Sequence, residues 1–253
     1  MKTIWITGGS SGIGLETAKK FTQNNWKVII SSRNSETLQQ AKESIKATSE
    51  NKEIHSIVCD ISKPDEVNQV VEKIENNIAP INLALLNAAA YSPNKSQEFD
   101  IENYNLLIDV NLKGTLNCIN ALQKKMSIRK KGHIAIVSSP VGYTGLPTAG
   151  AYGMTKAGLI NLAESLYFDF NKIGIKMSLV NPGFIKTSST SKNTFPMPFI
   201  KPASFAAEKI YEGLVNSKKF EIKFPFLFLN ILKALRILPY PIYFYLIKKF
   251  TGL

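Results

Sequence analysis

The stretch Thr7-Gly8-Gly9-Ser10-Ser11-Gly12-Ile13-Gly14 directly follows a short apolar run at the start of the chain. The run at residues 4–6 predicts a buried parallel strand, and residues 15–21 predict the first turns of a helix. A glycine-rich turn between a strand and a helix lets backbone N–H groups and the helix N-terminus approach a pyrophosphate. Three residues separate Gly8 from Gly12, so the turn differs from the common Gly-x-Gly-x-x-Gly pattern. Its glycines and two serines favour a nucleotide-binding turn over a merely tight turn.

The composition favours one large α/β domain and excludes several classes of protein. The 253 residues contain no repeat or long linker. Cys59 and Cys118 lie in apolar stretches without metal-ligand spacing, which predicts reduced core thiols, a cytoplasmic location and no bound metal. The net charge is +12, but residues 218–253 hold seven Lys or Arg and one acid, which is half of that excess. Because no nucleic-acid motif accompanies these cations, we expect no nucleic-acid partner.

Strand-like and helix-like segments alternate along the chain. Short runs rich in Ile, Val and Leu predict strands at 28–32, 54–58, 81–86, 133–138 and 175–180, and a possible last strand at 220–224. Amphipathic stretches predict helices at 35–47 and 65–77. Alternating βα units predict a Rossmann-like, doubly wound parallel sheet of about seven strands in a three-layer αβα single domain. Ligands of such sheets bind beyond the carboxyl ends of the strands, so we expect the site residues there.

Two predicted strand ends carry residues suited to an adenosine. At the second strand end, a carboxylate would accept from a ribose 2′-hydroxyl, but this chain has Ser32 followed by Arg33. The Arg33 guanidinium can donate paired hydrogen bonds to a 2′-phosphate, which predicts NADP(H) in preference to NAD(H). The alternative is a solvated loop arginine. Asp60 follows the third strand, where it could accept from an adenine amino group or cap the approach to the next helix.

The residues best suited to chemistry lie further along the chain. Ser139 ends the fifth predicted strand, and Tyr152 and Lys156 follow at an i, i+4 spacing that places them on one face of a helix. The ammonium should lower the pKa of the phenol from about 10 towards neutrality. A phenol so tuned can give or take a proton near physiological pH, and Ser139 can hydrogen-bond the reacting oxygen. A Tyr–Lys pair is common on helices, but its coincidence with a strand-end serine and a glycine turn is not.

These motifs resemble those of the short-chain dehydrogenase/reductase family over nearly the whole chain. The N-terminal turn resembles the family's Thr-Gly-x-x-x-Gly-x-Gly turn. Residues 109–114 (Asp-Val-Asn-Leu-Lys-Gly) resemble its asparagine motif, and residues 181–187 (Asn-Pro-Gly-Phe-Ile-Lys-Thr) resemble its Pro-Gly segment. Residues 87–90 are Asn-Ala-Ala-Ala, where Ala89 replaces the family's usual glycine.

The resemblance implies a catalytic tetrad and a nicotinamide cofactor. The tetrad maps to Asn111, Ser139, Tyr152 and Lys156. Ser139 would polarise a carbonyl, Tyr152 would protonate it, Lys156 would lower the pKa of Tyr152 and hold the ribose, and the Asn111 backbone carbonyl would connect Lys156 to solvent through a water. The implied cofactor contacts are Gly8, Ser10, Ser11, Gly12, Ile13, Gly14, Ser32, Arg33, Asp60, Ile61, Asn87, Ala88, Tyr152, Lys156, Pro182, Gly183, Ile185 and Thr187.

The implied activity is NADPH-dependent reduction of a ketone, or oxidation of a secondary alcohol in the reverse direction. The alternative is a non-catalytic NADP(H)-binding regulator or scaffold. The helices around 103–128 and 151–171 form the usual dimer surface of the family. The resemblance therefore implies a homodimer or a higher homo-oligomer.

An apolar lid and an apolar tail distinguish this chain. The predicted catalytic domain spans residues 1–224, with a substrate lid at 188–202. We expect Ser139 and the side chains of Val141, Tyr143, Leu146, Met154, Phe195 and Phe199 to line an apolar pocket. That pocket suits a lipophilic ketone or alcohol, such as a lipid-like or sterol-like one.

Residues 225–253 form a predicted helical, basic extension. Its apolar pieces, 225–238 and 242–247, are separated by prolines, and neither approaches the roughly 20 residues of a membrane span. Aromatic side chains beside Lys and Arg predict peripheral association with the cytoplasmic face of a membrane. A tail that covers the pocket or a partner subunit is an equal alternative.

Overall fold

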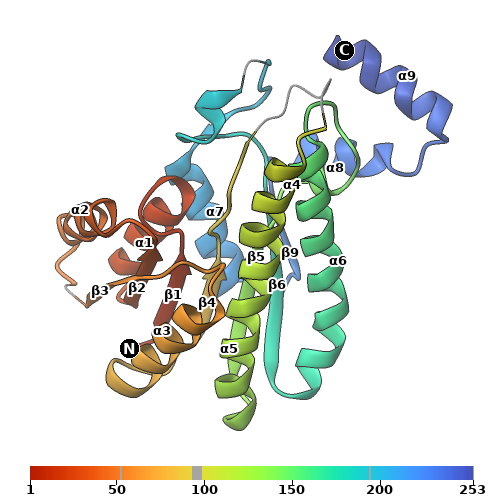
Figure 1. Cartoon of the computed structure of the whole chain (residues 1–253). Helices are drawn as coiled ribbons and strands as arrows, with labels where there is room; N and C mark the ends of the chain where they lie inside the picture. Colours follow the sequence, from red (N-terminus) through yellow and green to blue (C-terminus); the bar gives the residue numbers. More distant parts are fainter. Residues whose placement is uncertain (52, 93–98, 194, 253) are drawn as a thin grey trace.

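The computed structural model describes residues 1–51, 53–92, 99–193 and 195–252 (Figure 1). A parallel seven-stranded sheet in the order β3-β2-β1-β4-β5-β6-β9 forms its centre. The strands are β1 (Thr3–Thr7), β2 (Lys27–Ser32), β3 (Ile54–Val58), β4 (Leu83–Leu86), β5 (Gly132–Val137), β6 (Ile175–Pro182) and β9 (Glu221–Phe224). The short strands β7 (Ile185–Lys186) and β8 (Lys201–Pro202) pair with each other outside this sheet. The predicted Rossmann-like fold with about seven strands is confirmed.

Helices cover both faces of the sheet (Figure 1). On one face lie α1 (Gly12–Gln23), α2 (Ser35–Lys46) and α7 (Ala203–Val215). On the other face lie α3 (Pro64–Asn77), α5 (Gly114–Ile128) and α6 (Gly150–Lys172). The remaining helical segments are α4 (Ile101–Leu107), the π-helical η1 (Ile108–Lys113), the 3-10 turns η2 (Pro140–Gly142) and η3 (Thr190–Lys192), and the terminal α8 (Phe226–Leu235) and α9 (Tyr240–Thr251).

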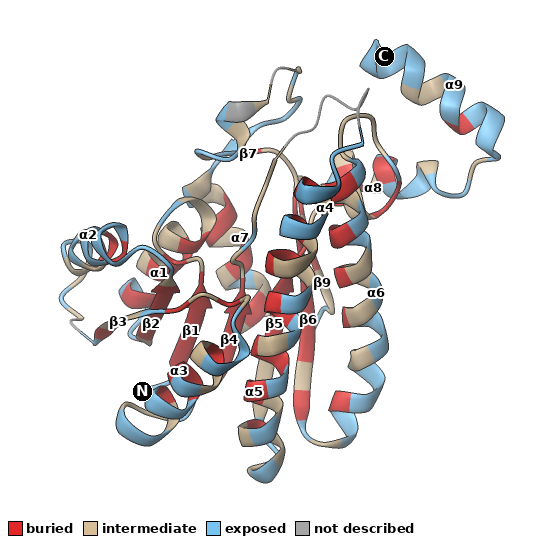
Figure 2. Cartoon of the chain, in the orientation of Figure 1, coloured by how far each residue is buried: buried red, intermediate tan, exposed pale blue. Residues whose placement is uncertain are grey.

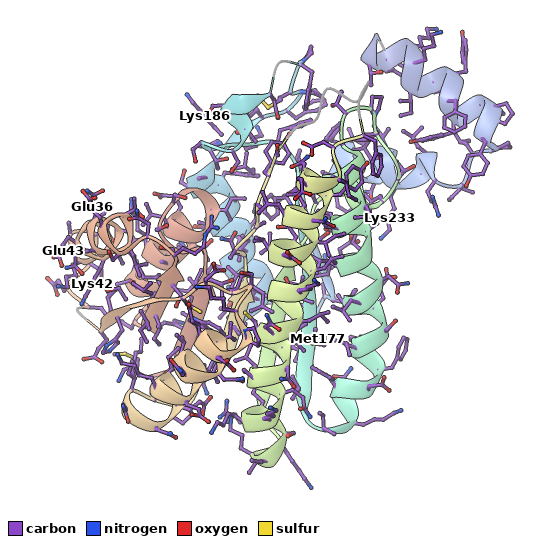
Figure 3. The ribbon with its side chains drawn as sticks, in the orientation of Figure 1. Glu36, Lys42, Glu43, Met177, Lys186 and Lys233 are labelled. Carbon is purple, nitrogen blue, oxygen red and sulfur yellow. The ribbon has the colours of Figure 1, made fainter. Side chains whose placement is uncertain are left out.

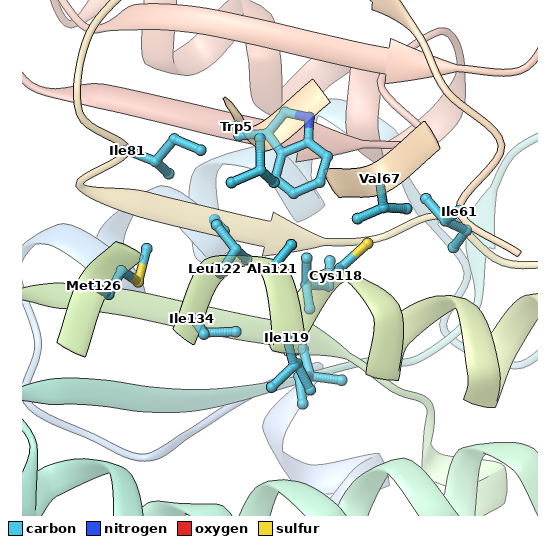
Figure 4. Packing of buried hydrophobic residues seen from close by; sticks show 14 of the residues in the cluster. Trp5, Ile61, Val67, Ile81, Cys118, Ile119, Ala121, Leu122, Met126 and Ile134 are labelled. Carbon is cyan, nitrogen blue, oxygen red and sulfur yellow. The ribbon is translucent and has the colours of Figure 1, made fainter. Parts of the chain in front are cut away.

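The central strands of the sheet are buried on both faces, which explains their largely apolar sequences, whereas the edge strands β3 and β9 are partly exposed (Figure 2). Trp5 of β1 lies over Ala121 and Leu122 of α5 in the larger core cluster (Figure 4). Its indole Nε1 donates to Ser31 Oγ at 2.9 Å, so the polar edge of this fully buried ring is satisfied.

Local sequence signals set the starts of α2 and α3. The side chain of Asn34 accepts from Thr37 N at 2.8 Å and caps α2, while Pro64 begins α3. The strand predicted at 81–86 begins only at Leu83. The reason is that the Ile81 N–H donates to Glu75 Oε1 (3.0 Å) and the Ile81 carbonyl accepts from Arg129 (2.6 Å), which replaces strand pairing with side-chain contacts.

The C-terminal extension forms two short helices, as predicted, but their bounds differ from those of the predicted pieces 225–238 and 242–247. The first ends at Leu235, and the second begins at Tyr240 because Pro241 fits the first turn of a helix. Both lie beyond the carboxyl ends of the strands, and α9 stands at the margin of the molecule (Figure 1). Among the helices of the described residues, none has the length and apolar character needed to cross a bilayer.

Candidate active site

A cavity of about 940 Å³ opens at the carboxyl ends of the central strands. Its wall includes the glycine turn, the ends of β4, β5 and β6, the start of α6 and the segment 187–199. Side chains of α8 and α9 complete it on the outer side. The position is the one expected for a ligand of a doubly wound sheet.

The glycine turn is packed too closely for side chains at its key positions. Gly8 has φ +65°, and a Cβ there would lie 2.8 Å from the Ala88 Cα. A Cβ on Gly14 would lie 2.3 Å from the Gly8 carbonyl oxygen. Asn87 holds the turn from the neighbouring strand, since its Nδ2 donates to the carbonyls of Thr7 and Gly8 at 3.1 Å.

The same turn fits the pyrophosphate of a dinucleotide. The N-cap residue Ser11 makes no side-chain cap at α1, so the first N–H groups of this helix are left to the cavity that Gly12 and Ile13 line. Thr187 closes the opposite wall, with its Cγ2 3.1 Å from where a Gly12 Cβ would lie. Free N–H groups at a helix N-terminus, with hydroxyls around them, are the donors that bind phosphate.

Helix α6 and β5 bring the three predicted catalytic side chains to the cavity wall. Ser139, Tyr152 and Lys156 all line it. Lys156 is only 2% exposed, and its Nζ donates to the Val137 carbonyl at 2.9 Å and lies 5.4 Å from the Tyr152 ring centre. The Ser138 hydroxyl donates to the Lys156 carbonyl at 2.8 Å, which fixes α6 against the end of β5.

Burial governs the protonation of this pair. Desolvation lowers the pKa of Lys156 to about 8. Desolvation also raises the pKa of Tyr152 well above its ordinary value, and Tyr91 adds to the rise while a hydrogen bond with Ser139 opposes it. The predicted lowering of the Tyr152 pKa by Lys156 is therefore wrong for this structure. Loss of hydration is the largest cause of the rise, and the Lys156 ammonium is directed to the Val137 carbonyl.

Asn111 lies behind the cavity wall in the π-helical η1. Its Oδ1 accepts from Ala90 N at 2.7 Å, and its Nδ2 donates to the Ala90 carbonyl and to Thr155 Oγ1, each at 3.1 Å. The side chain thus joins the segment after β4 to α6. The Asn111 backbone carbonyl accepts from Thr115 Oγ1 at 2.7 Å, so the predicted link through this carbonyl to Lys156 would use its second lone pair and stays a prediction.

Most of the predicted cofactor contacts line the cavity. They are Gly8, Ser10, Ser11, Gly12, Ile13, Asn87, Ala88, Tyr152, Lys156, Pro182, Gly183, Ile185 and Thr187. Gly14, Ser32, Arg33, Asp60 and Ile61 lie outside it. Gly14 is packed inside the turn.

The predicted adenosine residues lie around the ends of β2 and β3. Arg33 is exposed, and Asp60 accepts from Ser62 N (3.0 Å) and Ser62 Oγ (2.8 Å). Burial raises the pKa of Asp60, but these bonds and the charges of Arg33 and Lys63 lower it overall. The carboxylate thus caps the turn before α3, as one of the two predicted roles requires. Its contact with an adenine stays a prediction.

Two of the residues predicted to line the substrate pocket lie elsewhere. Ser139, Val141, Leu146, Phe195 and Phe199 line the cavity, whereas Tyr143 and Met154 do not. Met154 is 42% exposed, because two residues after Tyr152 a helix presents a different face. The Tyr143 hydroxyl instead donates to Glu221 Oε1 at 2.6 Å, behind the catalytic loop.

The structure adds an aromatic residue that the sequence did not indicate as functional. The ring of Tyr91 meets that of Tyr152 edge to face, with 4.8 Å between centres. The Tyr91 hydroxyl donates to Asn193 Oδ1 of the lid segment. Its place just after the Asn-Ala-Ala-Ala strand end was the available signal.

Side chains of the C-terminal helices form the outer wall, as the predicted alternative of a tail that covers the pocket requires, although no single residue of these helices was predicted as a pocket residue. Phe228 of α8 lies 6.0 Å from Phe184 and 5.8 Å from Phe199, measured between ring centres. Further contributions come from Ile231, Leu232, Leu235, Leu246, Ile247, Phe250 and Thr251. The amphipathic pattern of these helices could not show which surface they cover.

Comparison with known proteins identifies the family. The model of the short chain dehydrogenase family matches residues 2–196. The chain belongs to this family. Short-chain dehydrogenases are oxidoreductases that use a nicotinamide cofactor, and the glycine turn fits such a cofactor. The match ends before α8 and α9. Within the described residues, no cluster of three or more His, Cys, Asp or Glu side chains is arranged to hold a metal ion.

Individual relatives agree with the family assignment. An uncharacterized oxidoreductase of Myxococcus xanthus is 28% identical over 242 residues, which cover 96% of this chain and 94% of that protein. Carbonyl reductase family member 4 of Xenopus laevis is 34% identical over 75% of this chain and 78% of its own. The solved structure of ElxO with NADP bound is 27% identical, with a TM-score of 0.78 over 88% of this chain and 97% of that one.

Proposed function

We propose that this short-chain dehydrogenase is an NADPH-dependent carbonyl reductase of a lipophilic ketone, or in the reverse direction a dehydrogenase of the secondary alcohol. The observation that carries the proposal is that Ser139, Tyr152 and Lys156 line the same cavity as the glycine turn. A bound reduced nicotinamide would supply the hydride to the carbonyl carbon.

The protein's own residues would handle the carbonyl oxygen. Ser139 donates a hydrogen bond to it, and Tyr152 gives it the phenolic proton. The phenol of Tyr152 is protonated at neutral pH and so has a proton to give in the reductive direction, while the rise of its pKa by burial makes it a weaker acid than a phenol in water. Lys156 faces the same space and supplies a positive charge and hydrogen-bond donors for a ribose.

The preference for NADP(H) rests on Arg33. It follows the end of β2 in an exposed position, where its guanidinium is free to meet a phosphate. The turn residues Ser10 and Ser11 also line a smaller cavity of about 380 Å³ with Thr37 and Gln40 of α2. The hydroxyl and amide donors of this cavity would add hydrogen bonds to a phosphorylated ribose.

The lipophilic substrate is supported by the outer wall of the cavity. Phe195, Phe199, Phe228, Ile231 and Leu235 surround the space beyond Tyr152, and none of them offers a hydrogen bond. Such a wall favours alkyl or ring carbon over polar groups. The name of the Xenopus laevis relative, a carbonyl reductase, is consistent with a ketone as the oxidised substrate.

The test is NADPH oxidation with a panel of ketones that share one carbonyl environment and differ in apolar size. We expect kcat/KM to rise with apolar size. Activity on small ketones alone would contradict the lipophilic substrate. If no ketone is reduced although NADPH binds, the alternative function, a non-catalytic NADP(H)-binding regulator or scaffold, replaces the proposed enzyme.

We propose further that residues 225–253 are an extension of the catalytic domain 1–224 and that they rest on a membrane surface. Residues 222–253 contain five Lys or Arg and no acid. Exposed aromatic rings, including Tyr240, Phe244, Tyr245 and Phe250, accompany them. An anionic leaflet complements this charge, and the rings suit its headgroup region. With two free, buried thiols, the protein would work at the cytoplasmic face.

A homodimer is the assembly we propose. The family resemblance points to helices around 103–128 and 151–171, and exposed apolar side chains lie on them. They include Leu106, Leu116, Tyr167 and Phe168. Burying such residues against a second copy would remove apolar surface from water.

A further inference from the structure

A partly buried carboxylate joins the C-terminal helix α8 to the loop that follows Ser139. Glu221, the first residue of β9, accepts from Tyr143 Oη at 2.6 Å and from Asn181 Nδ2 at 2.8 Å. Its other oxygen pairs with Lys233 Nζ of α8 at 3.0 Å (Lys233 is labelled in Figure 3). Burial alone would raise the pKa of Glu221, but the bonds from Tyr143, Lys233 and Asn181 lower it. The group is therefore a carboxylate at neutral pH.

Tyr143 closes the turn that carries Ser139. Two backbone hydrogen bonds, from Gly142 N to the Ser139 carbonyl (2.9 Å) and from Tyr143 N to the Pro140 carbonyl (3.0 Å), make this turn one compact unit. A Cβ on Gly142 would lie 2.7 Å from the Lys156 carbonyl carbon, so the turn is pressed against the backbone of α6. A shift of the Tyr143 ring would therefore move Ser139 relative to Lys156.

The C-terminal helices hold the same loop at further points. The Tyr143 ring packs with Leu229 and Leu232 of α8, and Lys233 Nζ lies 5.3 Å from its centre. From α9, the Tyr243 hydroxyl donates to the carbonyl of Gly145. Both helices thus contact the loop that separates Ser139 from Tyr152.

We propose that Glu221 is a positioning residue for the reaction: it holds Tyr143 and α8 together and so keeps Ser139 in place beside Tyr152. The inference rests on the proposed carbonyl reduction. It makes α8 a determinant of the rate of the chemical step as well as a wall of the cavity. Small displacements matter because the donor must meet the reacting oxygen at hydrogen-bond distance.

The experiment compares Glu221→Gln with wild type and with Glu212→Gln, which removes an exposed ion pair with Lys209 on α7. The amide introduced by Glu221→Gln keeps one acceptor oxygen and loses the charge, and its NH2 group meets a donor on whichever side it takes, either Asn181 or Lys233. We expect kcat for the best ketone of the panel to fall about 10- to 100-fold with the KM for NADPH unchanged. Tyr143→Phe should reproduce the fall, and Tyr143→Phe combined with Glu221→Gln should add little to it. Glu212→Gln should behave as wild type.

Hydrogen exchange provides a readout that needs no turnover. Amides of residues 139–149 should exchange faster in Glu221→Gln than in Glu212→Gln, while those of β1 and β4 stay protected. An active wild type whose kcat survives Glu221→Gln would overturn the inference. If the wild type reduces no ketone, the proposed function fails by itself, and unchanged exchange at 139–149 would then overturn the positioning role separately. A Glu221→Gln protein that does not fold is replaced by Tyr143→Phe, with the same expectations.

Discussion

Tyr152 and Lys156 lie one helical turn apart, yet their environment rather than their spacing sets their protonation. Both are withdrawn from water at the end of β5. This raises the pKa of the phenol and lowers that of the ammonium to about 8. The phenol therefore holds its proton, and the lysine becomes easier to deprotonate. Two residue-level predictions follow from this pair and a third from Arg33.

Tyr152→Phe should abolish most turnover and leave cofactor binding intact. The substitution keeps the ring, and its edge-to-face contact with Tyr91, but removes the proton donor. Loss of a general acid costs about 10²- to 10⁴-fold in rate. Steady-state rates with a ketone, together with NADPH fluorescence titration, measure the two effects. Normal turnover in the Phe variant would remove Tyr152 from the mechanism.

Lys156 should make the folded state more stable as the pH rises from about 8 towards 10.5. Its pKa is about 8 in the folded state against the ordinary 10.5, so within this window the unfolded chain binds more protons. The gain is on the order of 3 kcal/mol. The test measures the unfolding free energies of wild type and Lys156→Met at pH 7 and at pH 10. The difference between the two proteins should change between these pH values in favour of wild type. The exposed Lys172→Met on the same helix is the control. A difference that does not change with pH would contradict the buried charge.

Arg33→Ala should weaken the binding of NADPH much more than that of NADH. A hydrogen bond to a charged group is worth roughly 1.5–3 kcal/mol, so the loss for NADPH should be about 10- to 100-fold in Kd. Arg33→Lys keeps the charge without the paired donors, so its Kd for NADPH should lie between those of wild type and Arg33→Ala. Calorimetric titration with both cofactors distinguishes them. Equal losses for NADPH and NADH would place Arg33 outside the 2′-phosphate site.

At the scale of elements, α8 and α9 are held to the body differently. Helix α8 buries Leu229 and Leu232 and is tied through Lys233 to Glu221. In α9 the buried residue is Tyr243, and most of the other aromatic side chains are exposed. We infer that α8 belongs to the cavity wall and that α9 offers its outer face to a surface.

Full-length protein should float with anionic liposomes and be released in part by high salt. Each Lys or Arg near a charged leaflet contributes about 1 kcal/mol, and salt screens it. Phe244→Ser with Tyr245→Ser, and separately Lys248→Glu with Lys249→Glu, should reduce flotation without loss of ketone reduction. Lys172→Glu, at the far end of α6, is the matched control. Wild-type protein that stays in the soluble fraction would leave α9 as a cover of the pocket or of a partner subunit.

At the scale of the whole molecule, two helix faces with apolar side chains stay exposed to solvent in a single copy. They lie on α4–α5 and on α6, around Leu116 and Phe168. We expect a dimer by light scattering at micromolar concentration. Leu116→Glu with Phe168→Glu should shift the protein towards monomer, whereas Ile237→Glu near the tail should not. Wild-type protein that is only monomeric would contradict the proposed assembly.

Much of the fold and of the site could be predicted because its signals are local. The glycine turn, the i, i+4 pair Tyr152–Lys156 and the period of the buried strands are set by backbone geometry over a few residues. The family resemblance then assigned Asn111 and the cofactor contacts. The strand bounds at residue 81 were missed because Glu75 and Arg129 satisfy the Ile81 backbone from distant positions.

The sequence alone therefore determined the sheet and the nucleotide turn, and it predicted three side chains, Ser139, Tyr152 and Lys156, that meet at one cavity. Only the tertiary structure decided that Tyr143 faces Glu221 instead of the pocket, that Tyr91 meets Tyr152, and that α8 closes the cavity. The same burial reversed the expected pKa shift of Tyr152. These outcomes depend on how segments some 60 to 90 residues apart pack and on how much water their packing excludes, as for Tyr143 and Glu221, 78 residues apart. No pattern within a short window contains that information.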